Sequence, residues 1–73
     1  MLGLLINDME QKELEYVLKR ELEELLMDLD DQRIDHMVKG AIRQRYQTIF
    51  RLFQRVASEK ECLKYMPKQF KNY

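Results

Sequence analysis

The stretch Asp28-Leu29-Asp30-Asp31 decides the fold, because it separates two segments that both show helical periodicity. Aspartate is a mediocre residue inside a helix and a strong residue at a helix N-cap. We therefore predict a tight turn near Asp30, with Asp30 or Asp31 capping the second helix. A connection this short makes consecutive helices antiparallel. The alternative is a single unbroken helix through the three aspartates.

The segment before the turn predicts a helix over residues 8–29. Asp8 and Gln11 have the spacing of a capping box, in which Asp8 is the N-cap. Apolar residues then recur at spacings of three and four, which is typical of an amphipathic helix. This stripe consists of Leu14, Val17, Leu18, Leu22, Leu25, Leu26 and Leu29.

The segment after the turn predicts a second helix over residues 32–57. Its apolar positions cover nearly half of the helix circumference, a wider arc than a two-stranded seam needs. The first helix cannot cover the whole of this apolar arc, so part of the arc needs another partner. We predict that a second copy of the chain provides it and that the two copies form a two-fold dimeric four-helix bundle. Aromatic residues dominate such interfaces, and the expected interface residues are Ile42, Tyr46, Ile49, Phe50 and Phe53.

A short third helix is predicted over residues 59–66. Ser58 and Glu61 form a capping box of the preferred residue types. Within this helix Leu63 and Met66 are expected to face inward, and Pro67 ends it. Residues 67–73 show no periodicity and are predicted to be a flexible tail. The whole chain, residues 1–73, is thus expected to be one all-α domain.

The net charge is zero, but the charge is unevenly distributed. Residues 8–31 carry ten acidic and three basic side chains, whereas residues 32–73 carry three acidic and ten basic side chains. The two halves could face each other, or the basic half could face another molecule. In the apolar arc of the second helix, Arg45 is predicted to form a half-buried ion pair with Glu15, which a turn near residue 30 places opposite it. The alternative is that Arg45 extends into solvent over its apolar neighbours.

The second helix also carries a basic face, which gives an alternative function. Arginine-rich helices bind nucleic-acid phosphates, and the residues in question are Lys39, Arg43, Arg51 and Arg55. However, the isoelectric point of the chain is about 6.6, and no aromatic residue lies between these bases on their face. We therefore favour a solvated face that the acidic residues balance, with nucleic-acid binding as the alternative.

Catalytic, metal and cofactor motifs do not stand out in this sequence. The single cysteine, Cys62, excludes an internal disulfide, and one cysteine with one histidine is poor material for a zinc site. The aspartates of residues 28–35, beside His36, lack the calcium-loop pattern and the Glu-x-x-His motif of di-iron bundles. We therefore expect no metal, no cofactor and no enzymatic activity.

The apolar run over residues 1–6 is shorter than the core of a signal peptide and too short to span a bilayer. A free cysteine without a secretory signal indicates the cytoplasm. A membrane-surface role is not expected, because the apolar stripes are needed for the core.

One stretch combines Arg33-Ile34-Asp35 with, further on, Val38, Gly40, Tyr46 and Ile49. This stretch resembles a short helical module found at the end of some bacterial proteins of unknown function. The resemblance covers less than a third of the chain, departs from the module at several positions, including His36 and Met37, and implies no particular activity. The expected function is therefore a non-enzymatic one, in which a homo-oligomer contacts another protein or regulates it through a helical face.

Overall fold

The computed structural model describes residues 1–67, and every structural statement below refers to these residues. They form three helices and no strand, which confirms the all-α class. Helix α1 spans Asp8–Asp30, α2 spans His36–Val56 and α3 spans Glu59–Tyr65. The predicted flexible tail lies outside the described residues from residue 68 onward.

Helix α1 is capped one residue earlier than predicted. The side chain of Asn7 accepts a hydrogen bond of 2.8 Å from the Glu10 N–H, and the Glu10 carboxylate accepts one of 3.0 Å from the Asn7 N–H. These two bonds make Asn7 and Glu10 the capping box. The predicted pair of Asp8 and Gln11 is wrong, and Gln11 instead donates a bond of 2.8 Å to the carbonyl of Val56. That bond ties the beginning of α1 to the end of α2.

The connection between α1 and α2 is longer than predicted, because Asp31 and Arg33 form a local turn. The Asp31 carboxylate accepts a 2.9 Å bond from the Arg33 N–H and two 3.0 Å bonds from its guanidinium. These bonds lower the pKa of the Asp31 carboxyl below its ordinary value. Helix α2 therefore begins at His36 instead of residue 32, and its N-cap residue is Asp35. The prediction that Asp30 or Asp31 caps α2 is wrong.

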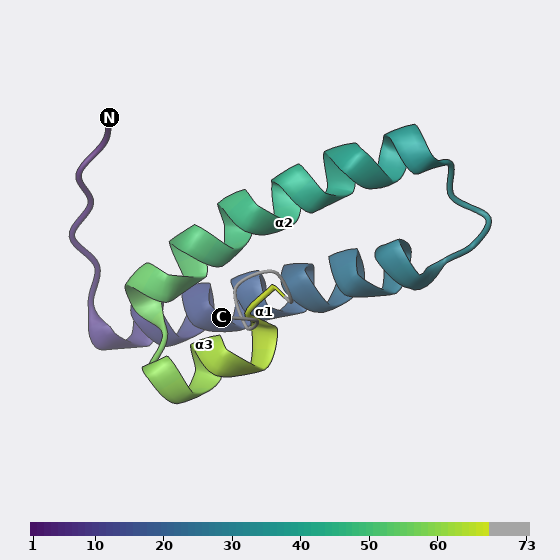
Figure 1. The fold of residues 1–73 in the computed structure, drawn as a ribbon. Helices are drawn as coiled ribbons and strands as arrows, with labels where there is room; N and C mark the ends of the chain where they lie inside the picture. The colour runs from purple at the N-terminus through teal and green to yellow at the C-terminus, as the bar shows by residue number, and fades with distance from the viewer. Residues whose placement is uncertain (68–73) are drawn as a thin grey trace.

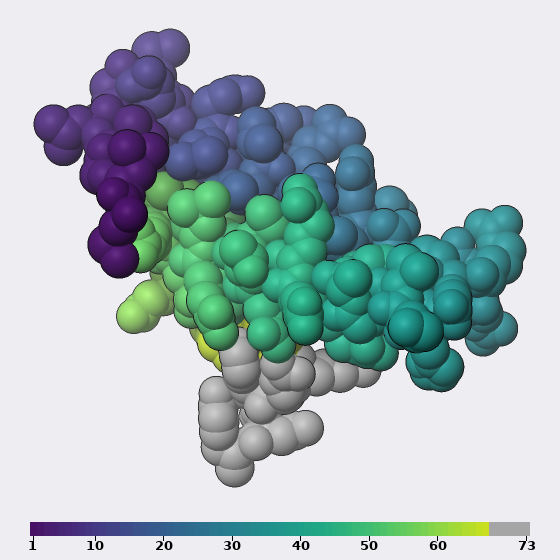
Figure 2. All heavy atoms as spheres, turned by 90° about the horizontal axis from the view of Figure 1, so that it is seen from above, coloured from purple at the N-terminus to yellow at the C-terminus, as the bar shows by residue number. Residues whose placement is uncertain are grey.

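Helices α1 and α2 lie side by side, and the chain reverses its direction between them (Figure 1). Helix α3 folds back at the far end and packs against α2. The first residues of the chain stand at one end of the molecule, opposite the connection between α1 and α2 (Figure 2). No described helix combines the length and the apolar character that crossing a membrane requires.

The core draws side chains from all three helices. Its buried members are Leu18, Leu22, Leu25, Tyr46, Phe50, Phe53, Cys62 and Tyr65. Only part of the predicted α1 stripe is buried, since Val17 and Leu26 remain exposed. In α3 the prediction for Leu63 is wrong, because the side of the helix that faces α2 holds Cys62 and Tyr65 and leaves Leu63 60% exposed. Met66, in contrast, is half-buried against the core.

Candidate interaction surface

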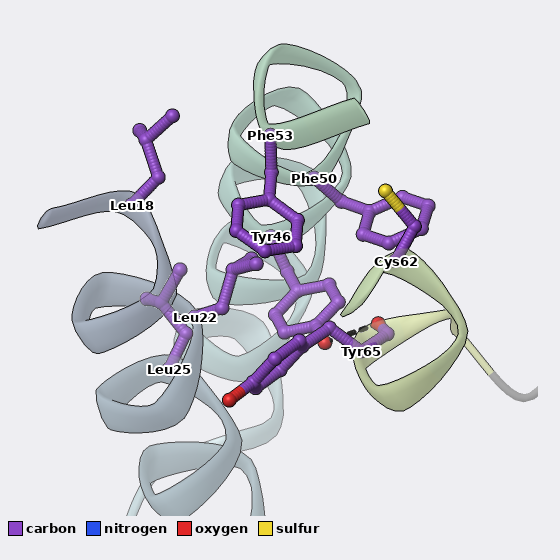
Figure 3. Close-up of a cluster of buried hydrophobic side chains, with 8 residues drawn as sticks. All are labelled: Leu18, Leu22, Leu25, Tyr46, Phe50, Phe53, Cys62 and Tyr65. Carbon is purple, nitrogen blue, oxygen red and sulfur yellow. Dashed lines mark hydrogen bonds between the residues drawn. The ribbon is translucent and has the colours of Figure 1, made fainter. Parts of the chain in front are cut away.

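The aromatic residues predicted to contact a second copy lie in the core of the single chain. The exposed fractions of Tyr46, Phe50 and Phe53 are 4%, 1% and 0%. Figure 3 shows how they gather between α2 and α3. The ring of Phe53 meets Tyr65 edge to face, with 5.6 Å between the ring centroids. The assignment of these three residues to an interface is therefore wrong, because a helix of seven residues in the same chain covers them.

The other two predicted interface residues have a different position. Ile42 and Ile49 are half-buried against the core cluster. They lie on the side of α2 that faces α1 instead of α3, about 40° and 60° around the helix from Tyr46. Each therefore keeps part of its surface available for a further contact.

Two tyrosine hydroxyls fix α3 in place. Tyr46 donates a hydrogen bond to the backbone carbonyl of Tyr65, shown as a dashed line in Figure 3. Tyr65 in turn donates a bond of 2.8 Å to Glu23 Oε2 on α1. Burial raises the pKa of both phenols to about 12, and the Glu23 carboxylate adds to the effect at Tyr65. Both hydroxyls therefore keep their protons at neutral pH and act as donors.

Cys62 is a free cysteine in the same core. Burial, and to a lesser degree the nearby carboxylates of Glu15, Glu59 and Glu61, raise the pKa of its thiol. A nucleophilic cysteine needs the opposite shift, toward the thiolate. The surroundings of Cys62 therefore support a packing role.

Arg45 pairs with Glu21, not with the predicted Glu15. Its Nε lies 3.3 Å from Glu21 Oε1, and the Arg45 side chain is 61% exposed, so the pair is not half-buried as predicted. The length of the connection explains the error. The connection covers residues 31–35 and is centred on residue 33, so the numbers of residues that lie opposite each other in the two helices add up to about 66. A turn near residue 30 would have given a sum of about 61, which is why Glu15 was expected opposite Arg45. An exposed pair of this kind adds little stability by itself.

Glu21 and Glu23 show which side of the helix pair is uncovered. At 3.6 residues per turn, these two side chains point in directions about 200° apart around the axis of α1. Glu23 meets Tyr65 of α3, whereas Glu21 meets Arg45 of α2. Helix α3 therefore covers one side of the α1–α2 pair and leaves the side with the Glu21–Arg45 pair open.

Apolar side chains surround the ion pair on this uncovered side. Helical spacing places Val17, Val38 and Leu52 there, and they are 52%, 51% and 41% exposed. Half-buried aliphatic residues of the same two helices lie between them and the core. We call this set the open face, and its members are Leu14, Val17, Glu21, Val38, Ile42, Arg45, Ile49, Leu52 and Val56. An exposed apolar patch that contains a few charged groups is typical of a protein interaction surface.

The predicted basic face of α2 is less compact than the open face. Arg43, Arg51 and Arg55 are exposed, whereas Lys39 is half-buried. At 100° per residue the four side chains spread over about 160° of the helix circumference. They form a band that winds around α2 from the α3 side to the edge of the open face.

Metal-ligating side chains do not gather at one point within residues 1–67. No group of three or more histidine, cysteine or acidic side chains there is placed to hold a metal ion. A hollow of about 490 Å³ lies between α1 and α2 near their connection, and its walls include Leu26, Leu29 and Pro67. Its polar groups, among them Asp30 and Arg43, do not include a nucleophile with an adjacent base.

Comparisons with protein-family models, with curated proteins and with solved structures find no match for this chain. The open face is the feature of the described surface on which a functional proposal can rest.

Proposed function

We propose that this chain is a non-enzymatic interaction module that works as a homodimer through the open face. In this dimer, the hairpin of α1 and α2 packs against the hairpin of a second copy and forms a four-helix bundle. The observation that carries the proposal is the exposure of Val17, Val38 and Leu52 on the one side of the hairpin that α3 leaves uncovered. The aromatic residues that the sequence placed at the interface are buried in the single chain and do not support the proposed dimer.

The size of the open face is compatible with a dimer of moderate affinity. Helices of 23 and 21 residues are each more than about 30 Å long. Two such helices packed about 10 Å apart present a face on the order of 600 Å². A stable interface typically buries about 800 Å² per partner. We therefore expect a dissociation constant in the micromolar range.

The composition of the open face favours a second copy as its partner. A two-fold interface uses the same patch twice, so it must complement itself. The open face satisfies this condition, since Glu21 and Arg45 provide opposite charges among its aliphatic side chains. A partner of another sequence is a further outcome that the experiment below distinguishes.

Sedimentation velocity between about 5 and 200 µM tests the proposal, a range that brackets micromolar affinity. We expect a species of twice the 9.0 kDa chain mass to accumulate with concentration. Val17→Glu and Leu52→Glu place charges on the open face and should abolish that species. The matched controls are Leu63→Glu and Met27→Glu, at sites that are 60% and 66% exposed away from this face, and they should leave it intact.

Circular dichroism of each variant separates loss of the dimer from loss of folding. A wild-type chain that stays at 9.0 kDa over the whole range would overturn the homodimer. A stable complex with another protein, lost in Val17→Glu but retained in Leu63→Glu, would then assign the open face to that partner.

Nucleic-acid binding is the alternative function, and the exposure of Arg43, Arg51 and Arg55 is the observation in its favour. Phosphate contacts would make the affinity for random duplex DNA or RNA fall steeply between about 50 and 200 mM salt. Binding with that salt dependence, lost on replacement of the three arginines by glutamine, would support the alternative. A chain that does not bind duplexes at low salt would exclude it.

A further inference from the structure

We infer that the two copies pack with their residue 31–35 connections at the same end of the bundle, so that α1 of each copy lies against α2 of the other. This inference rests on the proposed homodimer and specifies its arrangement. It follows from the position of two charged residues on the open face.

A two-fold axis allows two ways to pack one helix pair face to face with another. If the axis runs along the helices, α1 lies against α2 of the second copy and the two connections lie at the same end. If the axis crosses the helices, α1 lies against α1, α2 lies against α2, and the connections lie at opposite ends. Both arrangements bury the same apolar side chains, so other groups must distinguish them.

Glu21 and Arg45 distinguish them because both lie near the middle of their helices. Glu21 is two residues from the centre of α1, and Arg45 is one residue from the centre of α2. Groups near the middle of a helix meet their counterparts whichever way the second copy points. When α1 lies against α1, Glu21 therefore opposes Glu21 and Arg45 opposes Arg45, which is repulsive.

The same-end arrangement replaces this repulsion with attraction. Glu21 of one copy then lies beside Arg45 of the second copy as well as beside Arg45 of its own chain. The four groups form a ring of alternating charge around the two-fold axis, at the level where the intramolecular pair measures 3.3 Å. A network of this kind contributes more than an isolated exposed pair.

The remaining charges at the rim of the open face favour the same arrangement. On α1 this rim carries Glu24 and Asp28, which helical spacing places on the same side as Val17. Two α1 helices in contact would therefore bring four carboxylates to one seam. On α2 the corresponding rim carries Arg55 and no acidic residue. A seam between α1 and α2 of the other copy has only the two carboxylates of one α1, which favours the same-end arrangement.

Opposed apolar positions also match in the same-end arrangement. Because both connections lie at one end, the rule that opposed residue numbers add up to about 66 applies between copies as well. It places Val17 level with Ile49, and Leu14 level with Leu52. All four side chains keep some exposed surface in the single chain, so each gains a partner in the dimer.

Distances between spin labels at the connection test this arrangement. The full chain carries Gln32→Cys for the label and Cys62→Ala to remove the native thiol, and pulsed electron paramagnetic resonance measures the distance between copies. Gln32 is exposed and lies outside the helices. In the same-end arrangement the labels should lie roughly 20–30 Å apart, about two helix diameters. With the connections at opposite ends they should lie more than about 40 Å apart, because a whole helix length separates them.

A second label site provides the matched control. Lys12→Cys, also with Cys62→Ala, places the label at the opposite end of α1 on an exposed side chain. The same-end arrangement predicts short distances for both sites, and a long distance between a Gln32 label on one copy and a Lys12 label on the other. A dimer with the reverse pattern overturns the inference but leaves the proposed homodimer standing. A chain that sediments only as a monomer overturns both.

Discussion

The Tyr65 hydroxyl lies 2.8 Å from Glu23 Oε2, and this bond joins the shortest helix of the protein to the longest. Tyr65 also packs edge to face on Phe53 and accepts the Tyr46 hydroxyl at its backbone carbonyl. Helix α3 is therefore fixed to both α1 and α2 through one residue. Its position decides which side of the α1–α2 pair is covered and which side remains exposed.

We predict that Tyr65→Phe destabilises the fold by about 1–2 kcal/mol. The substitution keeps the ring on Phe53 but removes a part-buried hydrogen bond to the exposed carboxylate of Glu23. A neutral hydrogen bond contributes about 0.5–1.5 kcal/mol and one to a charged group about 1.5–3 kcal/mol. In a chain of this size, a loss of 1 kcal/mol lowers the thermal midpoint by roughly 4–8 °C. Thermal unfolding followed by circular dichroism measures the change.

Tyr16→Phe is the matched control for this prediction. Tyr16 is 53% exposed and its hydroxyl lies 3.4 Å from the Arg20 guanidinium, so removing that hydroxyl should cost less than about 0.5 kcal/mol. Equal effects of the two substitutions would show that the Tyr65 bond does not hold α3 in place.

We predict that the protein loses stability between pH 10 and pH 12. The pKa values of Tyr46 and Tyr65 are raised to about 12 in the fold, from an ordinary value of 10.0. The folded state therefore retains two protons that the unfolded chain releases in this range, so the stabilisation is complete below pH 10 and disappears as pH approaches 12. Urea unfolding at a series of alkaline pH values measures this loss.

The double variant Tyr46→Phe and Tyr65→Phe should be less stable at neutral pH but should have a shallower dependence on alkaline pH. Its unfolding free energy is expected to converge with that of the wild type toward pH 12. An unchanged slope would mean that other groups cause the alkaline transition.

Helical periodicity predicted most of the fold, because each long helix has a regular apolar stripe. It placed Leu18, Leu22 and Leu25 on the buried side of α1, where the structure has them. It could not show that α3 covers Phe50 and Phe53, since the docking of a seven-residue helix depends on tertiary contacts such as the Tyr65 bonds. The apolar arc of α2 therefore looked larger than the chain could bury.

The ion pair of Arg45 illustrates a different limit. Its partner depends on the number of residues in the turn, and Asp31 and Arg33 lengthen that turn through bonds within the connection. A shift of a few residues in the turn moves every predicted contact between the helices by the same amount. The open face could not be predicted for the same reason, because it is the side that remains after α3 and the Glu21–Arg45 pair have been placed.

We predict that Asn7→Ala destabilises the protein by about 1 kcal/mol, because Asn7 is the N-cap of α1 and its side chain satisfies the Glu10 N–H. Asp8→Ala should cost less, about 0.3–1 kcal/mol, since Asp8 only interacts with the helix dipole from the first turn. Chemical denaturation of the two variants ranks them. The reverse order would place the cap at Asp8.

The last prediction concerns Gly40, which lies inside α2 on the side away from the open face. Glycine in a helix interior costs about 0.5–1 kcal/mol relative to alanine, because the unfolded chain loses more backbone freedom on folding. A Cβ atom at this position would meet no other heavy atom within 4 Å. Gly40→Ala should therefore stabilise the protein by about 0.5–1 kcal/mol in urea unfolding and leave the proposed dimer unchanged.

Gly3→Ala provides the control for this gain, since Gly3 has equally open surroundings but lies before α1, outside every helix. It should change the unfolding free energy by less than about 0.3 kcal/mol, because the helix propensity of a residue matters only inside a helix. If Gly40→Ala fails to stabilise the fold while Gly3→Ala is neutral, α2 does not run unbroken through residue 40. In that case the two halves of α2, and with them Val38 and Leu52 of the open face, would not belong to one rigid surface.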